Sequence, residues 1–198
     1  LATEETRKAL DAADKIFSIF SFVTDERAST DAISPELLGT LVEQFAVDRA
    51  RQGVYYTPVP VVRYICRSAI EVLLGIRLAE TLTCPAEFRS EIIHKLDKLR
   101  VIDPACGCGA FLVGMFHELL EWNRILETSP SAEKIAQAQL FGIDLDDLAI
   151  HTTRIRLALA AQTVSNTPLA GDKLEHIAVG DALSPKSPES FAAASDLS

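Results

Sequence analysis

The sequence is poor in the features that mark secreted and membrane proteins. Its four cysteines are too few and too irregularly spaced for a disulfide framework, which indicates reduced thiols in an intracellular protein. No apolar run approaches the roughly 20 residues that span a bilayer, and the polar opening at residues 1–8 does not resemble a secretory signal. These absences predict a soluble, cytoplasmic protein with no membrane partner.

Positive charge is also scarce. Against 28 Asp and Glu the chain has 19 Lys and Arg, which gives a formal net charge of −9 and a pI near 4.9. Because non-specific nucleic-acid affinity comes mainly from neutralised phosphates, we do not expect this chain to hold a polyanion by itself. Its hydrophobic content of 48% is sufficient for an ordinary globular core.

The first part of the chain shows helical patterns only. Residues 1–50 predict a helical N-terminal segment, with an amphipathic stripe at residues 37–45. Thr57 can cap a further helix with Pro58 in its first position, and Gly75 is a natural stop. We expect the buried face of that helix to consist of Val61, Val62, Ile65, Ala69, Val72 and Leu73. Another helical pattern follows at residues 88–96.

From residue 99 onward, short apolar runs alternate with helical patterns. The runs at residues 99–102, 140–143 and 177–179 end at Asp103, at Asp144 and at Gly180-Asp181, and helical patterns lie between them. This alternation predicts an α/β fold with a parallel sheet, in which ligands bind beyond the carboxyl ends of the strands. The three Asp residues should therefore lie on one binding edge.

The loop after the first predicted strand carries the strongest signal, Asp103-Pro104-Ala105-Cys106-Gly107-Cys108-Gly109. Its two glycines let the backbone approach a ligand, and the helix that follows presents free amides. A dinucleotide fingerprint would need a third glycine where Leu112 stands, and a phosphate-binding P-loop would need Gly-Lys-Ser/Thr. Neither pattern is present, which disfavours phosphate ligands and an NAD-dependent oxidoreductase.

Residues 103–112 resemble the Asp-Pro-Ala-Cys-Gly-Ser-Gly-x-Phe-Leu motif of N6-adenine DNA methyltransferases, with Cys108 where Ser is more usual. Residues 53–58 are similar to the Gly-x-Phe-Tyr-Thr-Pro segment that precedes it in type I modification subunits and fused restriction-modification enzymes, with Tyr55 in place of Phe. Residues 142–145 and 180–183 resemble the second and third cofactor motifs of that family. The resemblance covers residues 33–183, in the family's order.

The resemblance implies a Rossmann-like fold of S-adenosylmethionine-dependent methyltransferases, present as a partial parallel sheet and preceded by a helical segment. We assign residues 1–50 to a helical appendage and residues 51–198 to the partial cofactor domain. The implied S-adenosylmethionine contacts are Tyr56, Thr57, Pro58, Asp103, Pro104, Ala105, Cys106, Gly107, Gly109, Phe111, Asp144, Leu145, Asp181 and Ala182. An acidic strand end suits this cofactor: Asp103 could face the ammonium, Asp144 the ribose diol and Asp181 the adenine amino group.

Several of these residues also have a simpler structural interpretation. Phe111 can pack under the loop, and Leu145 can either sandwich the adenine or fill the core. Cys106 and Cys108 lack the paired spacing of zinc sites, so we expect no metal. Two arginines farther along, Arg154 and Arg156, are expected on a solvated helix face.

The family's catalytic segment, Asn-Pro-Pro-Tyr or a close variant, does not occur in this sequence. We therefore expect no catalytic residues, a domain truncated before that motif, and a fragment that is inactive by itself. Half of a doubly wound sheet leaves a strand edge and an apolar face uncovered, which predicts self-association or modest stability.

The implied parent protein is a site-specific DNA adenine-N6 methyltransferase from a restriction-modification or phage-exclusion system, which would grip DNA through segments outside this fragment. Two alternatives stay open at this stage. One is a methyltransferase that acts on RNA or protein, because the cofactor half is shared among these enzymes. The other is a non-catalytic interaction subunit that keeps the fold without the chemistry.

Overall fold

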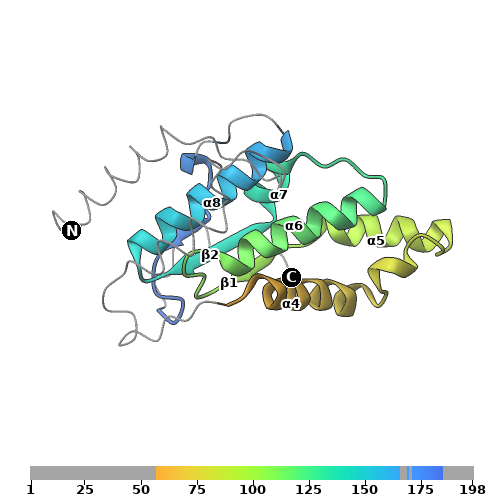
Figure 1. Ribbon diagram of the computed structural model, residues 1–198, viewed down its shortest axis with the longest axis horizontal. Helices are drawn as coiled ribbons and strands as arrows, with labels where there is room; N and C mark the ends of the chain where they lie inside the picture. The colour runs from red at the N-terminus through yellow and green to blue at the C-terminus, as the bar shows by residue number, and fades with distance from the viewer. Residues whose placement is uncertain (1–56, 166–168, 170, 185–198) are drawn as a thin grey trace.

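The computed structural model describes residues 57–165, 169 and 171–184, and Figure 1 shows their arrangement. The expected helical appendage at residues 1–50 and the candidate Tyr56 lie outside the described residues. The helices and strands are α4 (Val59–Leu74), η1 (Leu78–Glu80), α5 (Ala86–Lys98), β1 (Val101–Asp103), α6 (Ala110–Ile125), α7 (Ala132–Ala138), β2 (Leu140–Asp144), α8 (Asp147–Ser165), η2 (Gly171–Lys173) and β3 (Ile177–Val179).

The three strands form one parallel sheet in the order β1-β2-β3. Parallel neighbours need a crossover connection, and the chain supplies α6 and α7 between β1 and β2, then α8 between β2 and β3. Val101 pairs with Leu140, and Gly142 pairs with Ile177. The structure thus confirms the predicted α/β class and is consistent with a partial Rossmann-like methyltransferase fold.

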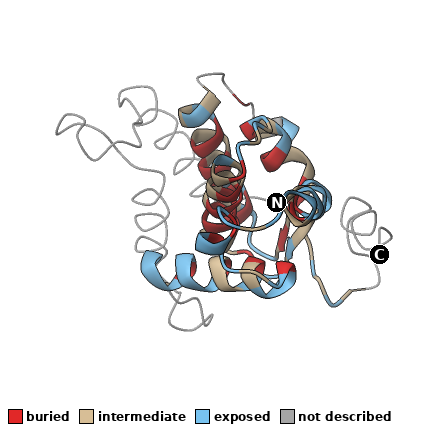
Figure 2. Cartoon of the chain, turned by 90° about the vertical axis from the view of Figure 1, so that its right-hand side faces the viewer, coloured by how far each residue is buried: buried red, intermediate tan, exposed pale blue. Residues whose placement is uncertain are grey.

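Helices α6 and α8 contact each other and both pack on β2, so they cover the same face of the sheet (Figure 1). The core lies between them and the sheet, where Figure 2 shows buried residues gathered in the middle of the molecule. Its largest fully buried side chains include Phe116, Trp122, Leu140, Ile143 and Leu157. Each side chain of this kind contributes about 1.5–3 kcal/mol when it is fully buried.

The opposite face of the sheet is more open. Ile102 and Phe141 are paired in register, so they project to the same face, and Ile102 remains 38% exposed. Among the described residues, β1 has β2 as its single strand neighbour. An unpaired strand edge and a partly apolar face therefore lie next to each other at β1.

Helix α4 differs from the expectation at its start and agrees with it at its end. Pro58 is the residue that precedes the helix, and no side chain caps it, so the predicted cap by Thr57 is wrong. Gly75 ends the helix in the left-handed region with φ of 70°, as predicted, because glycine adopts this conformation without the penalty of a Cβ.

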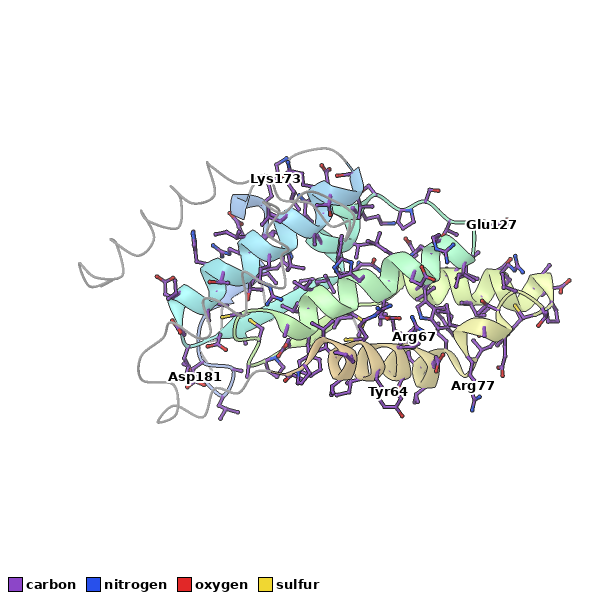
Figure 3. All side chains as sticks on the ribbon, in the orientation of Figure 1. Tyr64, Arg67, Arg77, Glu127, Lys173 and Asp181 are labelled. Carbon is purple, nitrogen blue, oxygen red and sulfur yellow. The ribbon has the colours of Figure 1, made fainter. Side chains whose placement is uncertain are left out.

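The predicted buried face of α4 is wrong except for Val62. The residues that pack inward are Val62, Cys66, Ile70 and Leu74, whereas Val61, Ile65, Val72 and Leu73 are between 44% and 83% exposed. The partner helix decides this outcome. Val62 packs where Gly114 of α6 has no side chain, and Arg67 forms a two-bond ion pair with the buried Glu118 of α6 at 2.9 and 3.2 Å. Figure 3 labels Arg67 on the side of α4 that faces α6.

Candidate functional site

The loop between β1 and α6 turns on two glycines with positive φ. Gly107 has φ of 52° and Gly109, which precedes the first residue of α6, has φ of 78°. A Cβ on Gly109 would lie 2.7 Å from Cγ2 of Thr153, whereas a Cβ on Gly107 would meet nothing within 4 Å. Gly109 is therefore required for packing against α8, and Gly107 leaves open space above the loop backbone.

Two carboxylates stand at this edge, as the sequence predicts. Asp144 at the end of β2 accepts hydrogen bonds from the backbone N–H groups of Gly107 at 2.8 Å and Asp146 at 3.0 Å, one on each oxygen. Asp103 at the end of β1 accepts one from Ala105 at 3.2 Å. Since each carboxylate oxygen has two lone pairs, acceptor capacity remains on both residues for a ligand.

Negative charge at this edge is not compensated by a cation among the described residues. Burial raises the pKa of the Asp103 carboxyl above its usual range, and the nearby charge of Asp144 raises it further, while the bond from Ala105 opposes both effects. A bound cation would relieve the repulsion between Asp103 and Asp144. The edge is therefore suited to a ligand that carries positive charge.

The end of β3 joins the same edge. The N–H of Gly180 donates to the backbone carbonyl of Asp144 at 2.9 Å, which ties the turn after β3 to the end of β2. Asp181 in this turn is exposed, and its carboxylate accepts from the N–H of Leu183 at 2.9 Å. Figure 3 shows Asp181 at this end of the molecule. Leu145 is 75% exposed, so the alternative that it fills the core is wrong.

Two side chains of α8 donate hydrogen bonds to the backbone of the loop, and neither was among the residues predicted from the sequence. Thr153 donates from Oγ1 to the carbonyl of Gly107 at 2.8 Å, and Arg156 donates from Nη1 to the carbonyl of Cys108. Arg156 is only 5% exposed, which corrects the expectation of a solvated face. Arg154 is also partly buried and donates to the carbonyl of Ile177 at 2.8 Å. The signal in the sequence was the place of Arg156 four residues before Ala160 and four after Thr152, because this spacing puts the three on one helix face.

The cysteines of the loop face the interior. Cys106 and Cys108 are both buried, and burial, followed by the charges of Asp103 and Asp144, raises the pKa of the Cys106 thiol. The Cys106 thiol is therefore protonated and unreactive at neutral pH. Within residues 57–165, 169 and 171–184 there is no group of three or more His, Cys, Asp or Glu placed to hold a metal ion.

The remaining candidate cofactor contacts lie at the same end of the fold and differ in how far they are buried. Pro104 and Ala105 are exposed on the loop, and Ala182 is half-buried in the turn after β3. Phe111 packs against the core, and its carbonyl accepts from Sγ of Cys66 on α4 at 3.7 Å. Thr57 and Pro58 precede α4, which begins at the end of the molecule where α6 and α8 also begin (Figure 1).

One edge of the sheet combines three features. Two carboxylates have no ion-pair partner among the described residues, the loop backbone is open at Gly107, and the turn after β3 carries a third carboxylate. This edge can hold a polar ligand that offers a cation and several hydrogen-bond donors.

None of the helices among the described residues has both the length and the apolar character needed to cross a bilayer.

The chain is similar to known DNA methyltransferases. Residues 81–179 match the family model of the MmeI DNA-methyltransferase domain. A protein of Methanocaldococcus jannaschii, named as a type II restriction enzyme and methyltransferase, is 28% identical over 177 residues, which covers 71% of this chain and 15% of that protein. DNA methyltransferase A of Bacillus subtilis is 23% identical over 138 residues, with 65% of this chain and 16% of that protein covered.

A third relative is the adenine-specific methyltransferase PglX of Streptomyces coelicolor, which is 32% identical over 95 residues, or 44% of this chain and 8% of that protein. The chain thus spans a small part of the curated relatives that it matches. No solved structure matches significantly. The family match covers β1, β2 and β3 together with the loops that carry Asp103, Gly107 and Asp144. The chain therefore belongs to the family of MmeI-type DNA-methyltransferase domains.

Proposed function

We propose that this chain forms the S-adenosylmethionine-binding part of a DNA adenine-N6 methyltransferase. The observation that carries the proposal is the pair of strand-end carboxylates, Asp103 and Asp144, beside the open backbone at Gly107. Neither carboxylate has a cationic partner among the described residues, so the site lacks the positive charge that this ligand supplies.

Several groups of the cofactor have a counterpart at the edge. Asp103, whose charge is disfavoured in the free protein, would gain most from the methionine ammonium. Asp144 keeps unused lone pairs that can accept from the ribose hydroxyls. The exposed Asp181 can accept from the adenine amino group, and the exposed Leu145 offers an apolar surface to the ring.

The bound cofactor would supply a methyl group on a sulfonium. The residues of this chain would bind that donor and orient it, with Gly107 leaving room for its close approach. No Asn-Pro-Pro-Tyr-like segment occurs in these 198 residues, so we assign binding and orientation to this chain and propose no catalytic base. Thr57 and Pro58, at the start of α4, would lie near the same ligand.

The relatives support the proposed substrate and role. Their names describe a type II restriction enzyme and methyltransferase, a DNA methyltransferase and an adenine-specific methyltransferase. We therefore favour DNA adenine over RNA or protein as the methyl acceptor, and restriction-modification or phage exclusion in the cytoplasm as the setting. Since the net charge is −9, segments beyond this chain would provide most of the DNA affinity.

Isothermal titration of the full 198-residue chain with S-adenosylmethionine tests the proposal. We expect saturable binding, weakened at least about tenfold by Asp144→Ala, because this change removes the diol acceptor and releases the Gly107 N–H. Asp146→Ala is the matched control: it removes one exposed carboxylate from the same loop and should change the affinity less than about threefold. Saturable binding of NAD, with none of S-adenosylmethionine, would contradict the proposal.

A further inference from the structure

The glycine loop is held from α8 by two consecutive backbone carbonyls. Thr153 Oγ1 donates to Gly107 O at 2.8 Å, and Arg156 Nη1 donates to Cys108 O. These bonds join residues 46 and 48 positions apart in the sequence, and both side chains are buried, with Thr153 fully inaccessible. The loop is therefore anchored on a helix that follows a different strand.

The direction of these carbonyls fixes the direction of the adjoining N–H groups. In a planar trans peptide the C=O and the N–H point in opposite directions. Since the carbonyl of Gly107 points to α8, the N–H of Cys108 in the same peptide points away from α8. The next peptide has its carbonyl on Arg156, and its N–H, from Gly109, donates to Cys106 O at 2.8 Å. The α8 contacts therefore determine how the loop backbone is presented to its outer side.

Packing makes the contact between the loop and α8 close. The Cα of Gly109 lies against Thr153, so tightly that a Cβ would come within 2.7 Å of Cγ2 and 2.8 Å of Oγ1. Burying the Arg156 guanidinium has a desolvation cost that only charge-assisted hydrogen bonds offset. Burying a guanidinium costs more desolvation free energy than burying an apolar side chain, so packing alone does not explain this hydrogen bond. The bond does fix the position of the loop carbonyl that accepts it.

We propose that Thr153 and Arg156 are positioning residues for the cofactor loop, and that they set its affinity for S-adenosylmethionine by fixing the peptides of Gly107 and Cys108. This inference rests on the proposed function. Neither residue touches the ligand; both act through the backbone of the loop. Their removal should loosen the loop and weaken binding while the α/β fold persists.

Neighbours on α8 provide matched controls. Thr152 is a buried threonine whose hydroxyl donates to Leu148 O inside the helix at 2.7 Å. Arg154 is an arginine that donates to Ile177 O on β3, and so ties α8 to the sheet without contact to the loop. Thr152→Val and Arg154→Met therefore remove the same kinds of bond as Thr153→Val and Arg156→Met, at places that do not hold the loop.

The experiment measures S-adenosylmethionine affinity by titration for these four variants of the full chain, with the free energy of unfolding of each. We expect Thr153→Val and Arg156→Met to raise Kd about fivefold to thirtyfold, as the loss of one buried hydrogen bond predicts. The two control variants should keep the wild-type Kd even if they are less stable. Arg156→Lys, which keeps a donating cation, should recover part of the affinity. Equal Kd for all folded variants would overturn the inference.

A second readout needs no ligand. The thiols of Cys106 and Cys108 are buried in the loop, so their alkylation rates, followed by peptide mass spectrometry, report on loop opening. Arg156→Met should speed alkylation at both thiols. Thr153→Val also removes a hydrogen bond to the Cys106 thiol, so its effect is read at Cys108, and Cys66 should stay as slow as in the wild type. If the wild type binds no S-adenosylmethionine, the proposed function fails, and faster alkylation would still establish that Thr153 and Arg156 hold the loop. Unchanged alkylation at both thiols would refute the role of Thr153 and Arg156 in holding the loop.

Discussion

The backbone N–H of Gly107 donates to Oδ2 of Asp144 over 2.8 Å. This bond joins the loop after β1 to the end of β2, across 37 positions of sequence. It holds Oδ2 against the loop, while Oδ1 accepts from the N–H of Asp146, and each oxygen keeps a lone pair for a ligand. The two halves of the candidate site therefore meet before any ligand binds, which reduces the ordering that binding must supply.

The pKa of Asp103 leads to a prediction about stability. Because its pKa is raised in the folded protein, the folded state binds more protons than the unfolded state between the two pKa values, so stability falls as pH rises through that window. Asp103→Asn keeps the acceptor for Ala105 and removes the charge, and it should raise the free energy of unfolding at pH 7. Urea unfolding followed by the fluorescence of the buried Trp122 measures this. A less stable variant at pH 7 would contradict the argument.

The same variant separates stability from binding. If Asp103 pairs with the ammonium of S-adenosylmethionine, wild-type affinity should fall as pH drops through the raised pKa of Asp103. Asp103→Asn should bind weakly and lose most of this pH dependence. Titrations from pH 8 downward, as far as the protein stays folded, measure both effects, and Asp146→Asn, at the same edge, is the control. An unchanged affinity in the more stable Asp103→Asn would remove Asp103 from the site.

Three glycines with positive φ allow the cost of a strained backbone to be measured separately from the cost of a steric clash. Alanine at Gly75, Gly107 or Gly109 should cost about 1 kcal/mol of stability from the left-handed backbone alone. Gly109→Ala adds the clash with Thr153 and should exceed about 2 kcal/mol. Gly107→Ala and Gly75→Ala should have similar stability, because neither Cβ meets an atom within 4 Å. Gly107→Ala should also weaken binding and Gly75→Ala should not, which thermal unfolding with and without S-adenosylmethionine would show.

The contact between α4 and α6 depends on the buried Glu118. Its side chain is 2% exposed and accepts two hydrogen bonds from Arg67, whose side chain is 39% exposed. Glu118→Gln should lower the free energy of unfolding by about 1–3 kcal/mol, since a charge-assisted bond is lost at a site with little water. The matched Glu121→Gln breaks the exposed pair with Arg124 and should cost under about 1 kcal/mol. Equal losses in urea unfolding would contradict this ranking.

Self-association through the open edge of β1 remains a prediction. Ile102 on the edge strand is an exposed apolar side chain, 38% accessible. We expect light scattering after size exclusion to show a concentration-dependent dimer of the chain, and Ile102→Lys to shift it toward monomer. Val164→Lys, at an exposed valine near the end of α8, should leave the equilibrium unchanged. A monomer at every concentration would rule out this surface.

Much of the architecture could be predicted from local sequence. The apolar runs that end at Asp103, Asp144 and Asp181 predicted β1, β2 and β3, because a short apolar run bounded by turn residues suits a buried parallel strand. Gly75 ends α4 within one turn of chain, so its role also follows from sequence alone. The acidic edge was predictable for a topological reason: parallel strands bring their carboxyl ends together.

Tertiary structure decided what depends on distant partners. The apolar residues of α4 extend around more than one side of the helix, and its period could not say which side α6 would cover; Gly114 and Glu118 of α6 made that choice. Arg156 looked like a surface residue because a charge is normally solvated, but the carbonyl of Cys108, 48 residues away, allows its burial. The sequence by itself determined the elements and their acidic ends, since these rest on local period and turn chemistry. Only the packing of α8 and α6 decided how the loop and α4 are held, since those contacts join residues far apart in the chain.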